Sequence, residues 1–230
     1  MMIRNAVILI FFSAFLLNVK AQKIDPGYTF NVELALPGSI ANAPFGDIMQ
    51  GLASGALYGQ YSFPFHLHVG AGIKYSLFTI NEFAIPEQRD GNMQVGAAFL
   101  KVGWDKFHND RFGTDIGVKV GYAENMFSTR NPNVVQEISE PLFKRVSSTN
   151  IETTMGLILT ADERNSYRLV LGHGVSGYGF KPEFIGLKSN EGYDVADFNK
   201  LTHYFIIGFG YTYYYGQYSF PFHLHVGAGI

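Results

Sequence analysis

Apolar and polar residues alternate along much of the chain, most regularly in residues 203–214. One face of an extended chain would carry large apolar side chains, namely Phe205, Ile207, Phe209, Tyr211 and Tyr213. The other face carries small or polar residues, with Ile206 as the exception. A period of two is that of a β-strand, and an apolar face with aromatics at one end is typical of a strand in lipid. We interpret residues 203–214 as the closing strand of a transmembrane barrel.

Seven further segments alternate in the same way, which predicts eight strands in total: residues 28–36, 51–62, 67–77, 93–107, 112–122, 151–160, 167–172 and 203–214. In the second segment, placing Gln60 inside puts Leu57 and Tyr61 outside. The fourth segment changes phase if Lys101 is kept inside. We therefore predict a β-bulge near residues 99–101.

The connections between these segments alternate in length. Long ones span residues 37–50, 81–92, 128–148 and 178–200, and short ones span 62–65, 108–111 and 162–165. Outer-membrane barrels have an even number of strands, short periplasmic turns and long outer loops. We therefore predict an all-β fold, an eight-stranded antiparallel up-and-down transmembrane β-barrel. A soluble periplasmic β-sandwich is the alternative, because its strands alternate too.

The N-terminus reads as a targeting segment. Arg4 precedes an apolar run, and Val19-Lys20-Ala21 is a small-x-small cleavage pattern, so we predict a signal peptide at residues 1–21 and a barrel domain at 22–214. After it, no apolar run is long enough for a transmembrane helix. The chain contains no cysteine, which excludes disulfides and lipid attachment through a cysteine.

The last sixteen residues, 215–230, repeat residues 58–73 without a difference. The copy starts inside one predicted strand and ends inside the next, whereas structural repeats tile whole units. We interpret it as a genetic or assembly artefact, or as a peripheral tail. The alternative is an added hairpin, although a closed barrel has no free edge to pair with it.

The alternation assigns charged residues of both signs to the interior. We predict a polar network in the lumen, formed by Glu33, His68, Lys74, Lys101, Asp115, Lys119, Glu152 and Arg168. An eight-stranded interior is just wide enough for side chains, so we expect these charges to pair and fill it. A narrow path for protons or small solutes is the alternative. His66 falls on the same face as His68, but too few further ligands are present to predict a metal, and we expect no cofactor.

Aromatic residues near the strand ends predict interfacial girdles. These are Tyr28, Tyr61, Trp104, Tyr122, Tyr167, Tyr211 and Tyr213.

His173 and Ser176 are the one hint of hydrolase chemistry, since small barrels that deacylate lipid A use a His and a Ser. A spacing of three places them on opposite faces of a strand, which argues against a proton relay. The sequence therefore favours a non-enzymatic barrel, with a lipid A-modifying hydrolase or a narrow channel as alternatives.

The residues also resemble a family. Val19 to Gln22 of the signal, the strand Val69 to Tyr75 and the closing Ile207 to Tyr213 are similar to small outer-membrane β-barrel-domain proteins, a group that includes PorT-like and OmpX- or OmpA-like barrels. The resemblance covers residues 22–214. It implies residence in the bacterial outer membrane among its lipids, and insertion by the barrel-insertion machinery through the aromatic closing strand. Our lead hypothesis for function is that the four long loops supply surface stability, adhesion or docking to an envelope complex. Scattered basic residues give no sign of nucleic-acid binding.

Overall fold

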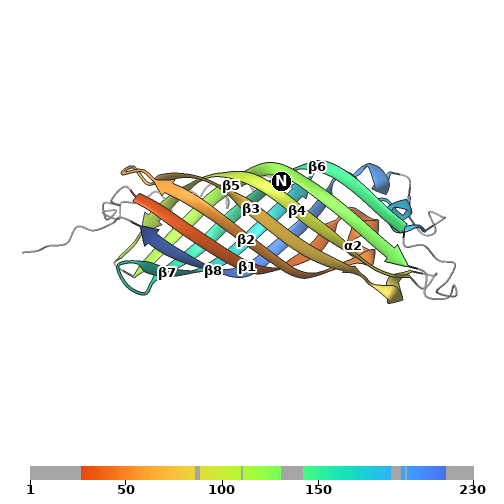
Figure 1. The fold of residues 1–230 in the computed structure, drawn as a ribbon, viewed down its shortest axis with the longest axis horizontal. Coiled ribbons are helices and arrows are strands. Elements are labelled where there is room, and N and C mark those ends of the chain that lie inside the picture. The colour runs from red at the N-terminus through yellow and green to blue at the C-terminus, as the bar shows by residue number, and fades with distance from the viewer. Residues whose placement is uncertain are drawn as a thin grey trace, which may run out of the picture.

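The computed structural model describes residues 27–85, 89–109, 111–130, 142–187, 193–194 and 196–215. Eight strands form one closed antiparallel barrel, in which each strand pairs with its neighbours in sequence and the last pairs with the first (Figure 1). The strands are β1 (Gly27–Ala41), β2 (Met49–Ser62), β3 (Leu67–Ile80), β4 (Asp90–Phe107), β5 (Phe112–Arg130), β6 (Leu142–Thr160), β7 (Asn165–Ser176) and β8 (Thr202–Tyr215). The predicted eight-stranded up-and-down barrel is confirmed.

Two predicted segments fall largely outside this description. The signal peptide at residues 1–21 is not among the described residues, and of the duplicated tail only Tyr215 is, as the last residue of β8. Tyr215 pairs with Tyr28 at the edge of β1. Both interpretations therefore stay predictions.

Short and long connections lie at opposite ends of the barrel. The connections from β2 to β3, from β4 to β5 and from β6 to β7 are short and lie at one end, called here the turn end. The other end, the loop end, carries α2 (Ala43–Ile48) and the short 3-10 helices η1 (Glu82–Ala84), η2 (Pro182–Ile185) and η3 (Asp197–Asn199) (Figure 1). The strands reach farther into the loop end than predicted, because β5 continues to Arg130 and β6 begins at Leu142.

The third turn shows how these tight connections are held. The carboxylate of Asp162 accepts hydrogen bonds from the Asn165 side chain and from the backbone N–H of Arg164, both at 2.8 Å. These bonds favour the charged carboxylate and hold the pKa of Asp162 below its usual range. The turn is thus closed by its own polar side chains.

The bulge predicted in β4 is wrong. Its pairing with β3 and with β5 runs without a register shift, so the strand keeps one phase throughout. Phe99 faces the interior, where its ring packs edge-on against Tyr58 at 5.9 Å between centroids. The prediction assumed a polar interior along the whole barrel, but the interior also accepts apolar residues: Val95 packs against the apolar core of the loop end, and Phe99 packs with Ala56 and Tyr58. Irregularities occur instead near the loop end, between Ser39 and Ala41 and between Gly51 and Ala53.

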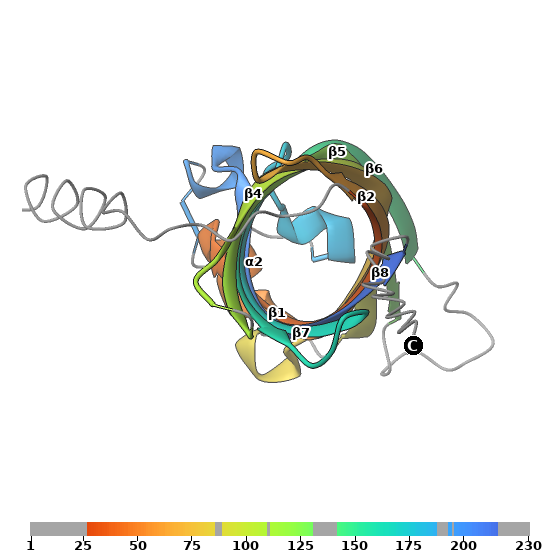
Figure 2. The ribbon, with the colours of Figure 1, turned by 90° about the vertical axis from the view of Figure 1, so that its left-hand side faces the viewer.

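An apolar core fills the loop-end half of the barrel. It combines inward residues of the strands with residues of the loops: Phe45, Ile48, Met49, Phe78, Ile80, Ile85, Met93, Phe127, Phe180, Ile185, Leu187, Tyr204 and Ile206. In the view along the barrel axis, η2 lies across the bore (Figure 2). The loops at this end therefore close the barrel rather than leave it open.

Asn42 fixes the start of α2 and joins two loops. Its side-chain oxygen accepts a hydrogen bond from the backbone N–H of Phe45 at 3.1 Å, with Pro44 in the first turn, a usual helix start. Its Nδ2 donates to the carbonyl oxygens of Asp197 at 3.1 Å and Lys200 at 2.9 Å. One buried amide thus connects α2 to the segment that leads into β8.

The outer face carries a continuous apolar band. Its exposed members include Phe30, Leu34, Leu57, Ile73, Leu100, Val102, Val118, Val120, Ile151, Met155, Leu157, Ile207 and Phe209. On β5 the band runs from Phe112 to Tyr122 and gives way to Glu124, which pairs with Arg145. Ten residue steps of about 3.3 Å, tilted by about 40°, span about 25 Å, the height of the lipid-facing band of outer-membrane barrels. No helix in the described part of the chain is long and apolar enough to cross a membrane.

Close strand packing at Gly72 yields a testable contrast. A Cβ at Gly72 would lie 2.2 Å from the Leu57 carbonyl oxygen and 2.3 Å from Tyr58 Cβ, whereas a Cβ at Gly96 would meet nothing within 4 Å. We expect Gly72→Ala to lower the free energy of unfolding by about 1–3 kcal/mol through overpacking. Gly96→Ala should leave it unchanged or raise it by about 0.5–1 kcal/mol. Urea unfolding followed by the fluorescence of Trp104, the single tryptophan, measures both; equal effects would contradict this packing.

Candidate functional site

The eight predicted lumen residues all lie on the inner face of the barrel and are buried. The structure adds three further partners, Tyr58, Asp105 and Tyr204. We call these eleven residues the lumen network. They lie at inward positions of all eight strands, so the period-two alternation of each strand aims them at the same space.

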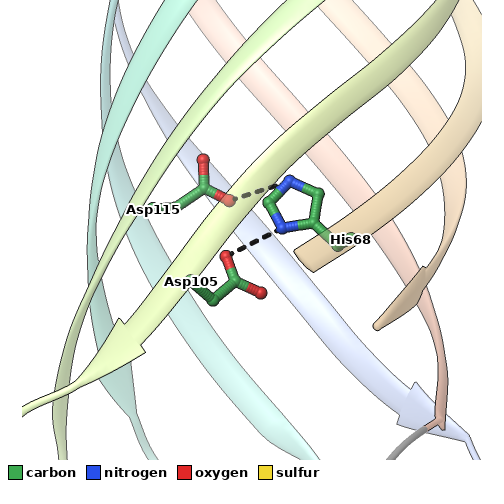
Figure 3. Close-up of side chains that lie close together, drawn as sticks. All are labelled: His68, Asp105 and Asp115. Atoms are coloured by element: carbon green, nitrogen blue, oxygen red, sulfur yellow. Dashed lines mark ion pairs between the residues drawn. The ribbon is translucent and has the colours of Figure 1, made fainter. Parts of the chain in front are cut away.

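At the turn end the network begins with His68 (Figure 3). Its Nδ1 lies 3.1 Å from Asp105 Oδ1, and its Nε2 lies 3.5 Å from Asp115 Oδ2, so one nitrogen faces each carboxylate. These are ion-pair distances, but neither nitrogen makes a well-directed hydrogen bond. Asp115 also accepts from Arg168 Nη1 at 3.0 Å and from Lys101 Nζ at 3.3 Å, which makes it the most heavily paired carboxylate of this end.

Tyr58 carries the network across the bore. Lys101 Nζ donates to the Tyr58 hydroxyl at 3.3 Å, and that hydroxyl donates to Glu33 Oε1 at 2.6 Å. Lys119 Nζ then bridges two carboxylates, Glu33 at 2.6 Å and Glu152 at 3.1 Å. The ammonium groups of Lys101 and Lys119 also lie over the Tyr58 ring, at 4.9 and 5.4 Å from its centroid, where the face of an aromatic ring attracts cations.

The network ends beneath the apolar core. Glu152 pairs with Lys74 and lies 3.2 Å from the Tyr204 hydroxyl. A cavity of about 20 Å³ adjoins this end of the network, and its lining includes the polar residues Lys74, Asn150 and Tyr204 and the apolar residues Phe45 and Phe78. That volume holds about one water molecule.

Charges in the network balance. Four carboxylates (Glu33, Asp105, Asp115 and Glu152) face four bases (Lys74, Lys101, Lys119 and Arg168), with His68 in addition. Buried charges persist when they are paired, and removal of one partner leaves the other uncompensated. The arrangement therefore fills and locks the turn-end half of the bore, as the apolar core fills the other half.

His68, Asp105 and Asp115 are the described residues whose types and closeness could hold a metal. Their geometry does not suit one. The two carboxylates lie at different nitrogens of the ring, so an ion bound at one nitrogen is turned away from the carboxylate at the other. Asp115 is in addition already neutralised by Arg168 and Lys101, which would repel a further cation. The trio is better suited to an ion-pair bridge than to metal coordination.

Three network members, Tyr58, Asp105 and Tyr204, lie outside the predicted set, although the alternation already places all three on the inner face, Tyr204 in phase with Thr202 and Gly208. Asp105 is four residues beyond Lys101 and Tyr58 is two residues before Gln60, so each shares the inward phase of a residue already assigned. The inward placement of His66, in contrast, is wrong. It sits in the first turn with a positive φ of 71°, and its ring packs against Trp104 on the outer face at 5.8 Å. The turn reverses its side chain relative to the strand that follows.

The seven predicted girdle residues all point outward. Six of them gather near the turn end: Tyr28, Tyr61, Trp104, Tyr167, Tyr211 and Tyr213. Ring pairs such as Tyr28 with Tyr61, at 4.9 Å between centroids, link neighbouring strands there. Tyr122 lies near the opposite edge of the apolar band, where its hydroxyl donates to Glu124.

His173 and Ser176 lie on opposite faces of β7, as predicted. Ser176 is buried in the bore and accepts a hydrogen bond from Asn150 at 3.2 Å. His173 is exposed on the outer face, and its Nε2 lies 3.2 Å from Nδ1 of His203 on β8. The two residues therefore do not form a serine–histidine relay.

Removal of one network charge should destabilise the barrel. Asp115→Asn leaves Arg168 and Lys101 without their shared carboxylate, and we expect a loss of about 3–5 kcal/mol in the free energy of unfolding. The matched change Glu124→Gln, in the exposed pair with Arg145, should have no measurable effect because water screens such pairs. Urea unfolding in lipid bilayers measures both variants. A loss in Asp115→Asn no larger than in Glu124→Gln would contradict a paired plug.

No protein-family model matches this sequence, and no curated protein sequence is significantly similar to it. Solved structures are similar in fold. The chain aligns with a major outer membrane protein of Thermus thermophilus at a TM-score of 0.56 and 12% identity, covering 82% of this chain and 99% of that one. It aligns with Neisserial surface protein A at a TM-score of 0.52 and 10% identity, covering 84% and 100%. The chain therefore has the fold of the small eight-stranded outer-membrane β-barrels, whereas the closer resemblance to PorT-like barrels stays a prediction.

Proposed function

We propose that this chain is a non-enzymatic integral outer-membrane protein whose loop end docks to another component of the cell envelope. The observation that carries the proposal is the combination of a filled bore with exposed aromatic side chains at the loop end. A barrel that is closed inside offers its surface for interaction, and that surface is most elaborate at the loop end.

Location follows from the outer face. The apolar band has the height that a bilayer requires, and a closed barrel satisfies every strand edge, as lipid demands. By the usual topology of these barrels, the turn end faces the periplasm and the loop end faces outward. The signal peptide predicted at residues 1–21 is consistent with export.

Apolar side chains extend beyond this band. Phe143 and Leu142 begin β6 on the far side of the Glu124–Arg145 pair and are exposed, and Phe83 in η1 is fully exposed. Apolar groups that neither lipid nor core covers mark interaction surfaces. Leu142 and Phe143 belong to the paired strand β6, and Ile85, which follows η1, is part of the apolar core, so a partner would meet a preformed surface.

The geometry supports neither a channel nor a lipid A hydrolase. A channel would need a path through the lumen network and the apolar core, and in the described residues both halves of the bore are filled. A lipid A hydrolase would need His173 and Ser176 on one face. The docking role is therefore the function that the geometry supports best.

The lipid location is tested by two arginine substitutions on one face of β4. Leu100 lies in the middle of the apolar band and Gln94 lies beyond it, toward the loop end. We expect Leu100→Arg to cost about 2–4 kcal/mol of stability in bilayers and Gln94→Arg about 0–1 kcal/mol. Refolding into lipid vesicles across a urea series measures the difference. Similar costs for both would argue against a bilayer around this band.

Docking is tested by photo-crosslinking at two phenylalanines of nearly equal exposure, Phe143 (63%) at the loop end and Phe65 (62%) at the turn end. With the crosslinker at position 143 we expect one discrete adduct with another envelope protein in native membranes, and none from position 65. Heat-modifiable migration on gels confirms that both variants are folded. A folded barrel with no adduct from position 143 would remove the docking proposal and leave a self-contained surface protein.

A further inference from the structure

Two histidines meet on the outer face of the barrel. His173 on β7 and His203 on β8 are thirty positions apart in sequence, and the register sets them diagonally, with His173 opposite Phe205 and His203 opposite Val175. Nε2 of His173 lies 3.2 Å from Nδ1 of His203, and the ring centroids are 5.3 Å apart. At this distance the two rings share one hydrogen bond, whose direction depends on the tautomers.

The same distance fits two ligands of one metal ion. Histidine nitrogens bind zinc at about 2.0–2.1 Å, and two such bonds whose outer atoms are 3.2 Å apart enclose an angle of about 100°. That angle is close to tetrahedral. The two rings therefore need little movement for a metal ion to replace the hydrogen-bonded proton between the two nitrogens.

Among the described residues, the strand neighbours of this site carry no positive charge that would compete with a metal ion. In the strand register the pair is flanked by Ala41, Thr153, Val175 and Phe205, none of which is charged. The paired strands hold both backbones in place, so the ligands are preorganised. Both rings point away from the bore, at the loop-end edge of the apolar band, where water or an anionic oxygen can occupy the remaining coordination positions.

The geometry points to a divalent transition-metal site formed by His173 and His203, suited to zinc or copper. Imidazole is a preferred ligand of both ions. Two protein ligands give an open and exchangeable site rather than a closed structural one, which uses four. The lumen plays no part in it, and the site is independent of the docking role.

Copper binding tests the site. The full chain, purified without a polyhistidine tag and carrying His223→Gln and His225→Gln so that the duplicated histidines do not bind, is titrated with Cu²⁺ in detergent micelles. We expect one equivalent to bind with two nitrogens in its electron paramagnetic resonance spectrum. His173→Gln or His203→Gln should weaken binding at least by the roughly 10–100-fold that loss of a supporting residue costs in metal sites.

His108→Gln is the matched control. His108 lies in a turn at the opposite end, with its Nε2 3.2 Å from Thr114 Oγ1, and its replacement should leave copper binding unchanged. Both histidines of the site are on the surface, so the variants should fold, and heat-modifiable migration verifies this. Absence of binding in the parent chain, a spectrum with one nitrogen, or equal affinity in folded His203→Gln would each overturn the proposal.

Discussion

The requirement that shapes this molecule is that the inside of a small closed barrel must be filled. Eight strands enclose a narrow space with little room beyond that of side chains, and a charge placed there must find a partner. The chain meets this requirement in two ways along one axis. Paired charges fill the turn-end half, and an apolar core to which the loops contribute fills the other half.

This division explains features that are otherwise unconnected. Toward the loop end the strands carry the inward residues Phe78, Met93 and Phe127, because α2 and η2 fold over them and need an apolar surface. At the turn end no helix covers the bore, and the connections between the strands there are short. Loops that serve as a lid are held in fixed positions, and this gives the proposed docking surface its stability. The barrel is thus a scaffold with a filled bore, and the binding sites proposed for it lie on its outer surface and at its loop end.

Alternation along the sequence is enough to predict the number of strands, which connections are long and which charged residues point inward. Each of these depends only on the period of two within a single strand. It fails where the environment changes along a strand. A bulge in β4 follows only if Val95, Ala97 and Phe99 need lipid. Instead, Val95 packs against the apolar core and Phe99 packs against Tyr58 inside the barrel. His66 is misplaced because a turn with positive φ does not follow the alternation. The nearness of His173 and His203 depends on the register of two strands joined by a long loop, which no local pattern contains.

The reach of the ion pairs across the bore has a consequence for assembly. Lys119 on β5 contacts Glu33 on β1, and Lys74 on β3 contacts Glu152 on β6, so neither pair exists in a hairpin of neighbouring strands. If a β-strand slipped by one residue, its charged side chains would turn toward lipid and their partners in the bore would be left unpaired. These pairs therefore form only when strands that are far apart in the sequence are all present and correctly aligned. A barrel whose strands are not yet all paired therefore contains unpaired interior charges. This electrostatic cost favours the correctly closed barrel over partly paired forms.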